Sequence, residues 1–446
     1  MNTKQIRQNI LDLAIRGELV PQDPTDEPAS VLLKRIHAEK EQLIKDKKLK
    51  RDKKDDEPID EVPFELPEGW EWCRGYEILN PMETQKPIGE MFGYIDIASI
   101  DNKNNRIIDA KFISVSEAPS RASRKVKFGD TLFSMVRPYL KNIAFVEEEY
   151  SNCIASTGFY ICSPNKTLYP KFLFYLMLSE YVVNGLNKYM KGDNSPSINN
   201  ENITNFFFPL PPLAEQERIV EKVEQLLAIV DTIEQLQEEL KALVKQTKNQ
   251  VLNYAIAGKL THQDPNDEPA EALLKRIGKT TATDTPYEKL PKGWACTQLQ
   301  VLCQLLDGEK KEAVSLPYLD VAFLRGRTES NYKESGRYIP KNTHLILVDG
   351  ENSGEIFTTT TEGYQGSTLK ILNISKEINE QYLFYVLKKE QQLFKESKTG
   401  SAIPHLNKKL FKELKVLLPP LAEQHRIVQQ IETFFASFDQ IEKMLT

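Results

Sequence analysis

The sequence predicts an α+β fold: two globular domains with β-sheets, separated by two long antiparallel helical (coiled-coil) regions, in a pseudo-two-fold internal repeat. Two long repeats and an alternation of helical with β-type segments predict it. The words PPLAEQ-x-RIV occupy Pro211–Val220 and return at Pro419–Val428, an offset of 419 − 211 = 208 residues. ILDLAIRGELVPQDPTDEPASVLLKRI at Ile10–Ile36 returns as VLNYAIAGKLTHQDPNDEPAEALLKRI at Val251–Ile277. Such tandem copies are typical of proteins with a two-fold symmetric partner or target.

The matching words also divide the chain. LP-x-GW at Leu66–Trp70 matches Leu290–Trp294, an offset of 290 − 66 = 224 residues, so the stretches between the boundary words differ in length. The predicted domains are 1–60, an N-terminal helical part with a charged linker; 61–210, a first globular block; 211–285, a central region with a long helix; 286–418, a second globular block; and 419–446, a C-terminal helix.

An apolar seam follows the first PPLAEQ word, with the spacing of three and four residues that is typical of a coiled coil. No Pro or Gly interrupts the segment from Leu213 to Ala257, and Gly258 is a typical helix stop. We therefore expect one helix of about 45 residues, close to 70 Å long. The seam residues are Ile219, Val223, Leu226, Val230, Ile233, Leu240, Val244 and Val251.

The second copy of this helix is split between the two ends of the chain. The seam starts again at Ile427 and stops with the chain, while Met1–Leu19 matches the last part of the central helix through AI-x-G. We expect both terminal helices to pack against the central helix, which brings the termini close. The alternative is an ordinary coiled coil that dimerises two chains.

The two blocks between the helical regions contain short β-type runs punctuated by Gly and Pro, and each then carries an apolar helical stretch. We therefore expect two α+β globules with separate cores, mostly dissimilar in sequence, on a shared frame. The β-type runs are Tyr94–Ile97, Thr131–Val136, Asn142–Val146, Phe159–Cys162, Tyr318–Val321, Leu345–Val348 and Leu369–Leu372, and the helical stretches are Phe172–Leu176 and Tyr382–Val386.

Composition excludes several classes of protein. The formal net charge is -6, so wholesale binding of polyanions is not expected, although a local basic face remains compatible with this charge. The five cysteines are odd in number and lack CxxC spacing, and the five histidines form no close ligand pair. We therefore expect no disulfides, no metal site and a reducing, cytoplasmic location. No segment has the roughly 20 apolar residues that a membrane span needs.

The common catalytic signatures are absent from the sequence. It contains no G-x-x-x-x-G-K-[ST] loop, no G-x-G-x-x-G after a strand, and no G-x-S-x-G elbow. It also lacks the Asn- or Asp-Pro-Pro-aromatic word of amino-methyltransferases. The PPL words instead predict a rigid start to a helix, because Pro restricts itself and the preceding residue. A binding protein is favoured over an enzyme.

Side chains of the types that bind phosphates and base edges cluster inside each block. For any one cluster a solvated loop is the alternative. The predicted DNA-contacting residues are Arg121, Arg124, Lys125, Lys127, Arg137, Lys141, Lys191 and Asn194 in the first block, and Arg325, Arg327, Thr359, Lys398, Ser401, His405 and Lys408 in the second. The basic run Lys45–Lys54 contains interleaved acids and has no counterpart in the second copy, so we interpret it as a solvated helix or tether rather than a phosphate-binding arm.

The order of these words, PPLAEQ-x-RIV, a long helix, AI-x-G-x-L-x-x-Q-D-P-x-D-E-P-A and LP-x-GW, twice over, closely resembles the specificity subunit of type I restriction–modification systems. The resemblance covers essentially the whole chain. It implies two target-recognition domains, each recognising one half of a bipartite site in double-stranded DNA. Where the first block has Val136-Arg137, the second has Asp349-Gly350-Glu351, so a DNA contact by Arg137 does not transfer to the second copy.

The resemblance also implies partners and cofactors. The helical regions would act as a spacer and as a docking surface for two modification subunits, which carry S-adenosylmethionine and methylate adenine. Restriction subunits would add ATP- and Mg-dependent translocation and nuclease activity. No cofactor is expected on this chain, which would be a non-catalytic DNA-recognition subunit that contacts no membrane.

Three alternatives remain open from the sequence alone. The chain could be an autonomous nuclease or methyltransferase, a coiled-coil scaffold with no DNA role, or a stand-alone DNA-binding homologue in a methylation-only system. Activity of the purified chain tests the first alternative, and binding to selected against random duplexes tests the second.

Overall fold

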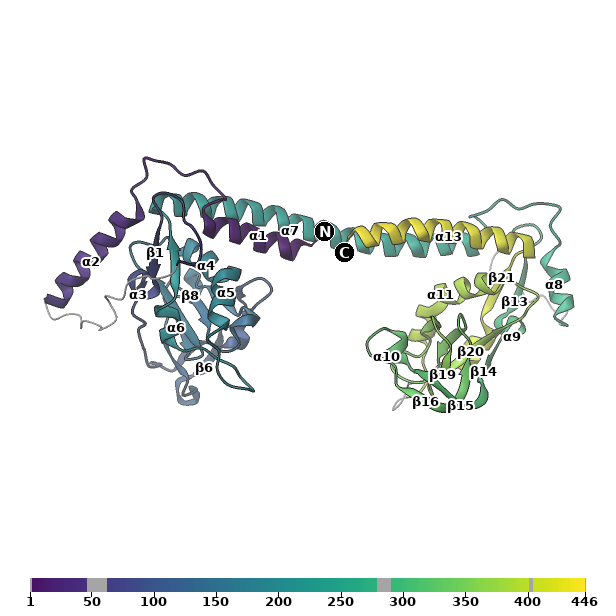
Figure 1. Cartoon of the computed structure of the whole chain (residues 1–446). Coiled ribbons are helices and arrows are strands. Elements are labelled where there is room, and N and C mark those ends of the chain that lie inside the picture. The colour runs from purple at the N-terminus through teal and green to yellow at the C-terminus, as the bar shows by residue number, and fades with distance from the viewer. Residues whose placement is uncertain (1, 46–61, 279–289, 401–403, 446) are drawn as a thin grey trace. The chain divides into compact units, whose positions relative to one another are not determined.

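A computed structural model describes residues 2–45, 62–278, 290–400 and 404–445 (Figure 1). The predicted basic run from Asp46 onward and the candidate Ser401 lie outside this part of the chain. Two compact units are present, the first unit Asn2–Leu236 and the second unit Gln237–Thr446. The boundary between them falls inside helix α7, Leu213–Ile256.

Helix α7 is the long helix that the apolar seam predicts. It runs unbroken for 44 residues and is followed by Gly258, which has the left-handed φ of 66° that suits a glycine helix stop. Its counterpart α13, Leu421–Met444, also begins directly after a Pro-Pro pair. The interpretation of the PPL words as rigid helix starts is therefore confirmed.

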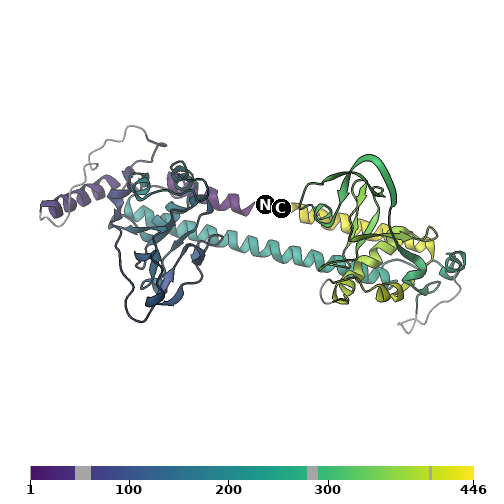
Figure 2. The same ribbon diagram turned by 90° about the horizontal axis from the view of Figure 1, so that it is seen from below.

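In the first unit, helix α1, Thr3–Arg16, packs antiparallel against α7 (Figures 1 and 2). The Arg7 guanidinium donates to the Glu234 carboxylate at 3.0 Å, far along α7. The chain after α1 returns to the start of α7, where the Gln22 amide donates to Glu215 at 3.2 Å. The expectation that the N-terminal helix lies along the central helix is confirmed.

In the second unit, α13 packs against α7 in the same antiparallel manner. Lys248 Nζ lies 2.8 Å from a carboxylate oxygen of Asp439 and 2.8 Å from one of Glu442. At the other end, the Gln263 amide donates to Glu423, near the start of α13, at 3.1 Å. Each unit thus contains an antiparallel helical pair, α1 with α7 in the first unit and α13 with α7 in the second.

The first unit carries a globule of twelve strands, five α-helices and four short 3-10 helices among its described residues, besides α1 and α7. The α-helices are α2 Ala29–Lys45, α3 Gly75–Ile78, α4 Pro170–Leu178, α5 Glu180–Asn187 and α6 Asn200–Thr204. The strands are β1 Glu71–Arg74, β2 Leu79–Asn80, β3 Met91–Ile95, β4 Ile100–Asp101, β5 Arg106–Ile107, β6 Lys111–Ser114, β7 Ala122–Lys125, β8 Thr131–Ser134, β9 Ile143–Phe145, β10 Ile154–Ser156, β11 Phe159–Pro164 and β12 Phe207–Leu210.

The second unit carries a globule of nine strands and five helices among its described residues, besides α7 and α13. The helices are α8 Ala270–Arg276, α9 Leu299–Leu302, α10 Val321–Leu324, α11 Glu380–Glu396 and α12 Lys408–Glu413. The strands are β13 Ala295–Gln298, β14 Cys303–Leu306, β15 Glu309–Leu319, β16 Tyr332–Ile339, β17 His344–Leu347, β18 Ile356–Thr358, β19 Gly363–Gln365, β20 Leu369–Ile374 and β21 Lys415–Leu418. Every β-type run and helical stretch predicted in the two blocks overlaps a strand or helix, which confirms the α+β class. Two predicted β-type runs extend too far, because Ile97 begins a 3-10 helix and Val321 begins α10.

The two globules share one frame although their sequences differ. Each globule has a two-stranded antiparallel pair that joins its first and last strands, β1–β12 or β13–β21. A four-stranded sheet has the order β2-β11-β8-β9 in the first unit and β14-β20-β17-β18 in the second, which is the same order of strands along the chain. A parallel pair, β3–β10 or β15–β19, follows in each. Its register aligns Tyr94 and Ile154 with Tyr318 and Tyr364.

The globules diverge around this parallel pair. In the first unit β3 also pairs with β6, giving an open sheet of order β6-β3-β10-β7. In the second unit β15 pairs directly with β16, so β15, β16 and β19 form a closed barrel. We call the β15–β16 hairpin the ribbon. Most of its residues are exposed on both strands, with a register shift between Glu312 and Leu316.

The repeated words meet at the start of the long helices, where they join each globule to its helix. The Trp70 indole N–H donates to the buried Glu215 carboxylate at 3.0 Å, and Trp294 donates to the buried Glu423 at 2.9 Å. A buried carboxylate is costly unless it accepts hydrogen bonds, so PPLAEQ and LP-x-GW depend on each other. We call Trp70–Glu215 and Trp294–Glu423 the junction pairs.

Other residues of the repeated motifs contribute ion pairs to the same junctions. Arg218 lies 2.6 Å from Asp26, and Arg426 lies 2.6 Å from Asp267, which joins the RIV words to the DEP words. Burial raises the pKa of Glu215 above the ordinary value, against the lowering effect of its hydrogen bonds from Trp70 and Gln22. The motifs shared by the two copies are therefore structural.

Candidate nucleic-acid interface

A polar loop, residues 188–200, folds back onto the end of β8 in the first unit. Lys191 and Ser197 form a β-bridge, and Ser197 also bridges Val136. The Arg137 N–H donates to the Pro196 carbonyl at 2.8 Å, and the Arg137 guanidinium donates to the carbonyl of Asn194 at 2.7 Å. Three predicted residues, Arg137, Lys191 and Asn194, therefore come together and are exposed.

The second unit builds an equivalent loop. His405 bridges Thr399 and Asp349, as Ser197 bridges Lys191 and Val136. The Gly350 N–H donates to the Pro404 carbonyl at 2.8 Å. The His405 imidazole lies 2.7 Å from the Asp349 carboxylate, and Lys398 Nζ lies 3.1 Å from Glu351. The predicted Lys398 and His405 are thus brought together, each beside a carboxylate.

Hydrogen bonds align Arg137 with Gly350. Met135, which precedes Val136-Arg137, and Val348, which precedes Asp349-Gly350, each donate a backbone N–H to the turn that follows β10 or β19. The acceptors are the carbonyls of Gly158 in the first unit and Thr368 in the second. Both Arg137 and Gly350 have positive φ, 47° and 109°. The expectation that an Arg137 contact does not transfer to the second copy therefore has a structural basis, because a glycine occupies the position.

The basic cluster of the first unit lies on and beside β7. Lys125 and Lys127 both pair with Glu83, and their hydrogen bonds lower the pKa of Glu83 to about 2. Arg121 is exposed, and its carbonyl accepts the Thr157 N–H at 2.9 Å. Since Thr157 precedes Gly158, this bond links Arg121 to the segment that supports Arg137.

Arg124 occupies the centre of β7, opposite Ala155 of β10. Its Nε atom is buried and has no hydrogen-bond partner among the described residues. Lys141 is partly buried and lies 2.7 Å from Glu180, whose pKa it lowers by this hydrogen bond. DNA phosphates would have to compete with the carboxylates that hold Lys125, Lys127 and Lys141.

The remaining candidates of the second unit do not form one surface cluster. Arg325, at the end of α10, is paired with Glu355. Arg327 and Lys408 are exposed. Thr359 is 1% exposed, and its hydroxyl donates to the Pro340 carbonyl and accepts the Thr343 N–H. The prediction that Thr359 contacts DNA is therefore wrong, because its hydroxyl is hydrogen-bonded inside the fold and does not face solvent.

The ribbon of the second unit is a basic and aromatic element that the sequence prediction missed. Lys310 lies directly opposite Arg337, so the two cations share one face. Lys311 Nζ lies 4.1 Å from the centre of the Tyr338 ring. A two-stranded β-ribbon fits the major groove of B-DNA. The basic character of the ribbon was not evident in the sequence, because Glu309, Glu312 and Glu334 are interspersed among its cations.

A cavity of about 560 Å³ in the first unit has a mixed lining. Glu147 and Glu149 lie in its wall together with Arg106 and Lys171. The two carboxylates balance the two cations, so this cavity has no excess of positive charge to attract phosphates. Among the described residues no group of three or more His, Cys, Asp or Glu is placed to hold a metal ion, and no helix is long and apolar enough to cross a membrane.

Comparison with known proteins identifies the family. The model of the type I restriction modification DNA specificity domain matches residues 76–242 and 293–446. The specificity subunit of the Escherichia coli type I restriction enzyme EcoAI is 32% identical to this chain. The match covers 68% of this chain and 63% of that relative's length. The EcoEI specificity subunit, also from Escherichia coli, is 26% identical over 99% of this chain and 90% of its own.

Two solved structures support the same conclusion. A chain from a structure of the type I R-M system is 27% identical, with a TM-score of 0.68 over 86% of this chain and 94% of its own. The HsdS subunit from Thermoanaerobacter tengcongensis is 27% identical, with a TM-score of 0.56 over 87% of this chain and 94% of its own. The chain therefore belongs to the family of type I restriction–modification specificity subunits, the non-catalytic subunits through which such complexes recognise specific DNA sequences.

Proposed function

We propose that this chain recognises a bipartite site in double-stranded DNA, with each unit selecting one half of the site. One observation carries the proposal. The two globules repeat a frame, but the equivalent polar loops present different side chains, Arg137, Lys191 and Asn194 in one and Asp349, Lys398 and His405 in the other. A shared frame with different polar surfaces suits two domains that recognise unrelated DNA sequences.

The chemistry of each domain follows from its side chains. Exposed cations such as Arg121 and Lys408 would hold phosphates, which position the protein without selecting sequence. Arg137 is suited to a bidentate contact with guanine, and each such pair contributes roughly 1–3 kcal/mol of discrimination. Lys125, Lys127 and Lys141 would first have to leave their carboxylate partners. Selection in the two half-sites would therefore rest on different residues.

We further propose that the helical regions set the spacing between the half-sites and bind two modification subunits. The 44 residues of α7 contain no break, which suits a spacer of fixed length. The modification subunits would carry S-adenosylmethionine and methylate adenine after extruding it from the duplex. Restriction subunits, with ATP and Mg, would complete the complex in the cytoplasm.

The corresponding division of the chain is also a proposal. Target-recognition domains would occupy 61–210 and 286–418. The central conserved region would occupy 211–285. The distal conserved region would combine 1–60 with 419–446, and these two helical regions would hold the domains.

Sequencing of the modified bases in the host DNA tests this function. One methylated motif with two specific halves and a non-specific spacer should be present with the chain and absent when its gene is deleted. A continuous motif, or a bipartite motif that persists after deletion, would contradict the proposal. Nuclease or methyltransferase activity of the purified chain alone would also contradict it.

A further inference from the structure

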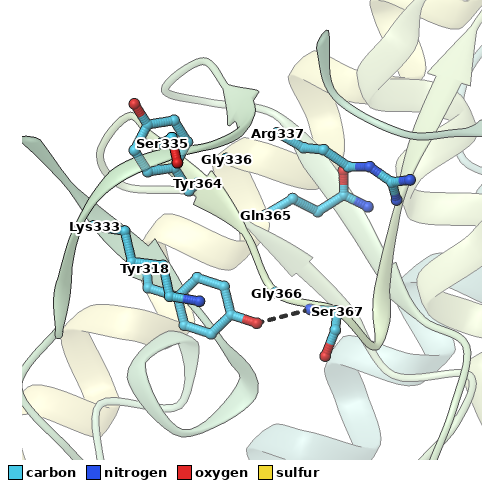
Figure 3. A pocket seen from close by; sticks show the side chains of 9 residues that line it. All are labelled: Tyr318, Lys333, Ser335, Gly336, Arg337, Tyr364, Gln365, Gly366 and Ser367. Carbon is cyan, nitrogen blue, oxygen red and sulfur yellow. Dashed lines mark hydrogen bonds between the residues drawn. The ribbon is translucent and has the colours of Figure 1, made fainter. Parts of the chain in front are cut away.

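A cavity of about 280 Å³ opens between the ribbon and β19 in the second unit (Figure 3). Its wall contains Tyr318, Lys333, Ser335, Arg337, Tyr364 and Ser367, and we call it the ribbon pocket. Two cations and no carboxylate line it. The ribbon pocket therefore has the charge of an anion site, unlike the cavity of the first unit, where Glu147 and Glu149 offset Arg106 and Lys171.

The cations of the ribbon pocket are held in place. Lys333 Nζ lies 3.4 Å from the centre of the Tyr318 ring, a favourable cation–π position. The Tyr318 hydroxyl accepts the Ser367 N–H at 3.0 Å, which fixes the ring. Arg337 Nη1 lies 2.7 Å from Asp307, and a guanidinium with five N–H donors keeps others for a ligand.

The other copy shows that the frame does not require a cavity here. Strand register aligns Tyr318 and Tyr364 with Tyr94 and Ile154 of the first unit. There, Tyr94 and Ile154 belong to a closed apolar cluster with Phe92 and Ala122, covered by Ile113 of β6. The fold can therefore fill this position with packed side chains, yet the second unit builds a polar pocket with an aromatic wall.

The ribbon pocket adjoins the polar loop of the same unit. Ser367 is followed by Thr368, whose carbonyl accepts the Val348 N–H at 2.8 Å. The Val348 carbonyl in turn accepts the Leu406 N–H at 2.8 Å, next to His405. Pocket and loop thus belong to adjacent hydrogen-bonded segments of the second unit.

We propose that the ribbon pocket binds a backbone phosphate of the DNA half-site recognised by the second unit, with Lys333 and Arg337 as its ligands and the Tyr318 ring against the adjoining sugar. This inference rests on the proposed function. The size of the ribbon pocket suits a phosphate group. Its volume of about 280 Å³ lies just below the roughly 300–1,000 Å³ typical of small-molecule sites. The contact positions the DNA and selects no base.

Binding of the full-length chain to a duplex with its own target, measured over a range of salt concentrations, tests the inference. Lys333→Met keeps the alkyl stem over Tyr318 and removes the charge, and Arg337→Ala removes the second ligand. Each variant should bind about tenfold more weakly, as expected for one charge-assisted hydrogen bond. The slope of log K against log salt should become shallower by about 0.9. The preferred sequence should stay unchanged.

The matched control is Lys376→Ala, which removes an exposed lysine between β20 and α11, outside the ribbon pocket. It should bind as the wild type does. A duplex with one neutral methylphosphonate, moved through the second half-site, should weaken wild-type binding at the phosphate held by the pocket and weaken Lys333→Met less there, because only Arg337 remains to contact it. Thermal unfolding of each variant, compared with the wild type, separates loss of a contact from loss of fold.

The outcomes separate the two proposals. If the wild type binds its target selectively while Lys333→Met and Arg337→Ala match its affinity and salt slope, the ribbon pocket proposal is overturned and the proposed function stands. A change of preferred base in Lys333→Met would also overturn it, because a phosphate ligand selects no base. Absence of selective binding by the wild type would overturn both.

Discussion

Arg137 and Gly350 occupy the same position in the two copies. Each has a positive φ, and each donates its backbone N–H to a proline carbonyl of the polar loop, Pro196 or Pro404, at 2.8 Å. Glycine adopts this conformation without steric cost, whereas a left-handed arginine is strained by roughly 1–2 kcal/mol. The first unit thus places a guanidinium where backbone geometry favours glycine.

Arg137→Gly should separate DNA recognition from stability. The variant copies the second unit, so its free energy of unfolding should stay within about 1 kcal/mol of the wild type or rise slightly. Discrimination at the first half-site should fall by roughly 1–3 kcal/mol, while the second half-site keeps its selectivity. Denaturant unfolding and binding to duplexes altered in one half at a time provide the measurements. Unchanged discrimination in both halves would remove Arg137 from the interface.

Gly17→Ala should destabilise the first unit more than Gly89→Ala. Both glycines have positive φ, so each substitution costs about 1 kcal/mol in backbone strain. At Gly17 an added Cβ would also overlap the Pro67 ring and lie 3.1 Å from Trp70, whereas nothing lies within 4 Å at Gly89. Overpacking adds roughly 1–3 kcal/mol, measurable by denaturant unfolding. Equal losses for the two variants would show that AI-x-G does not pack against LP-x-GW as described.

Glu215 should make the stability of the first unit depend on pH. Burial raises its pKa in the folded chain above the ordinary value of about 4.3, so the folded state binds the proton more tightly than the unfolded state. Its contribution is fully present below the ordinary pKa and is lost as pH rises through the raised value. The difference in free energy of unfolding, wild type minus Glu215→Gln, should therefore fall as pH rises from about 4. A difference that grows with pH would contradict the raised pKa.

A four-residue helical insertion between Gln235 and Lys241 should lengthen the spacer of the recognised site. Four residues add about 6 Å of helix and roughly 40° of rotation, while one base pair spans about 3.4 Å. The methylated motif should keep both halves and gain one or two base pairs between them, with some loss of affinity. Sequencing of sites methylated by the variant with its modification subunits provides the measurement. An unchanged spacer with retained activity would show that docking on the partner sets the distance.

Much of this fold could be predicted because it depends on local signals. The seam from Ile219 to Val251 and the uninterrupted stretch to Gly258 predict α7 within one residue of its end. The contact that explains PPLAEQ was not predictable, since Trp70 and Glu215 are 145 residues apart and neither forms a local motif with the other. Spacing within one copy carries no information about such a pair.

The candidate site was less predictable than the fold. Composition placed Lys191 and Asn194 in one polar loop, but their approach to Arg137 depends on how that loop folds back and was not predicted. The predicted DNA contact of Thr359 is wrong, because its hydroxyl is hydrogen-bonded to the backbone of Thr343 and Pro340. The ribbon pocket depends on strand register, which brings Lys333 to Tyr318 across a bulged hairpin, and register was not visible in the sequence.

Exchange of one globule tests the central claim most directly. Replacing residues 286–418 with the matching block of another family member, and sequencing the sites then methylated in the host, asks whether the two units recognise DNA independently. The account predicts a motif with one new half, the other half unchanged and the same spacer. A motif altered in both halves would contradict it.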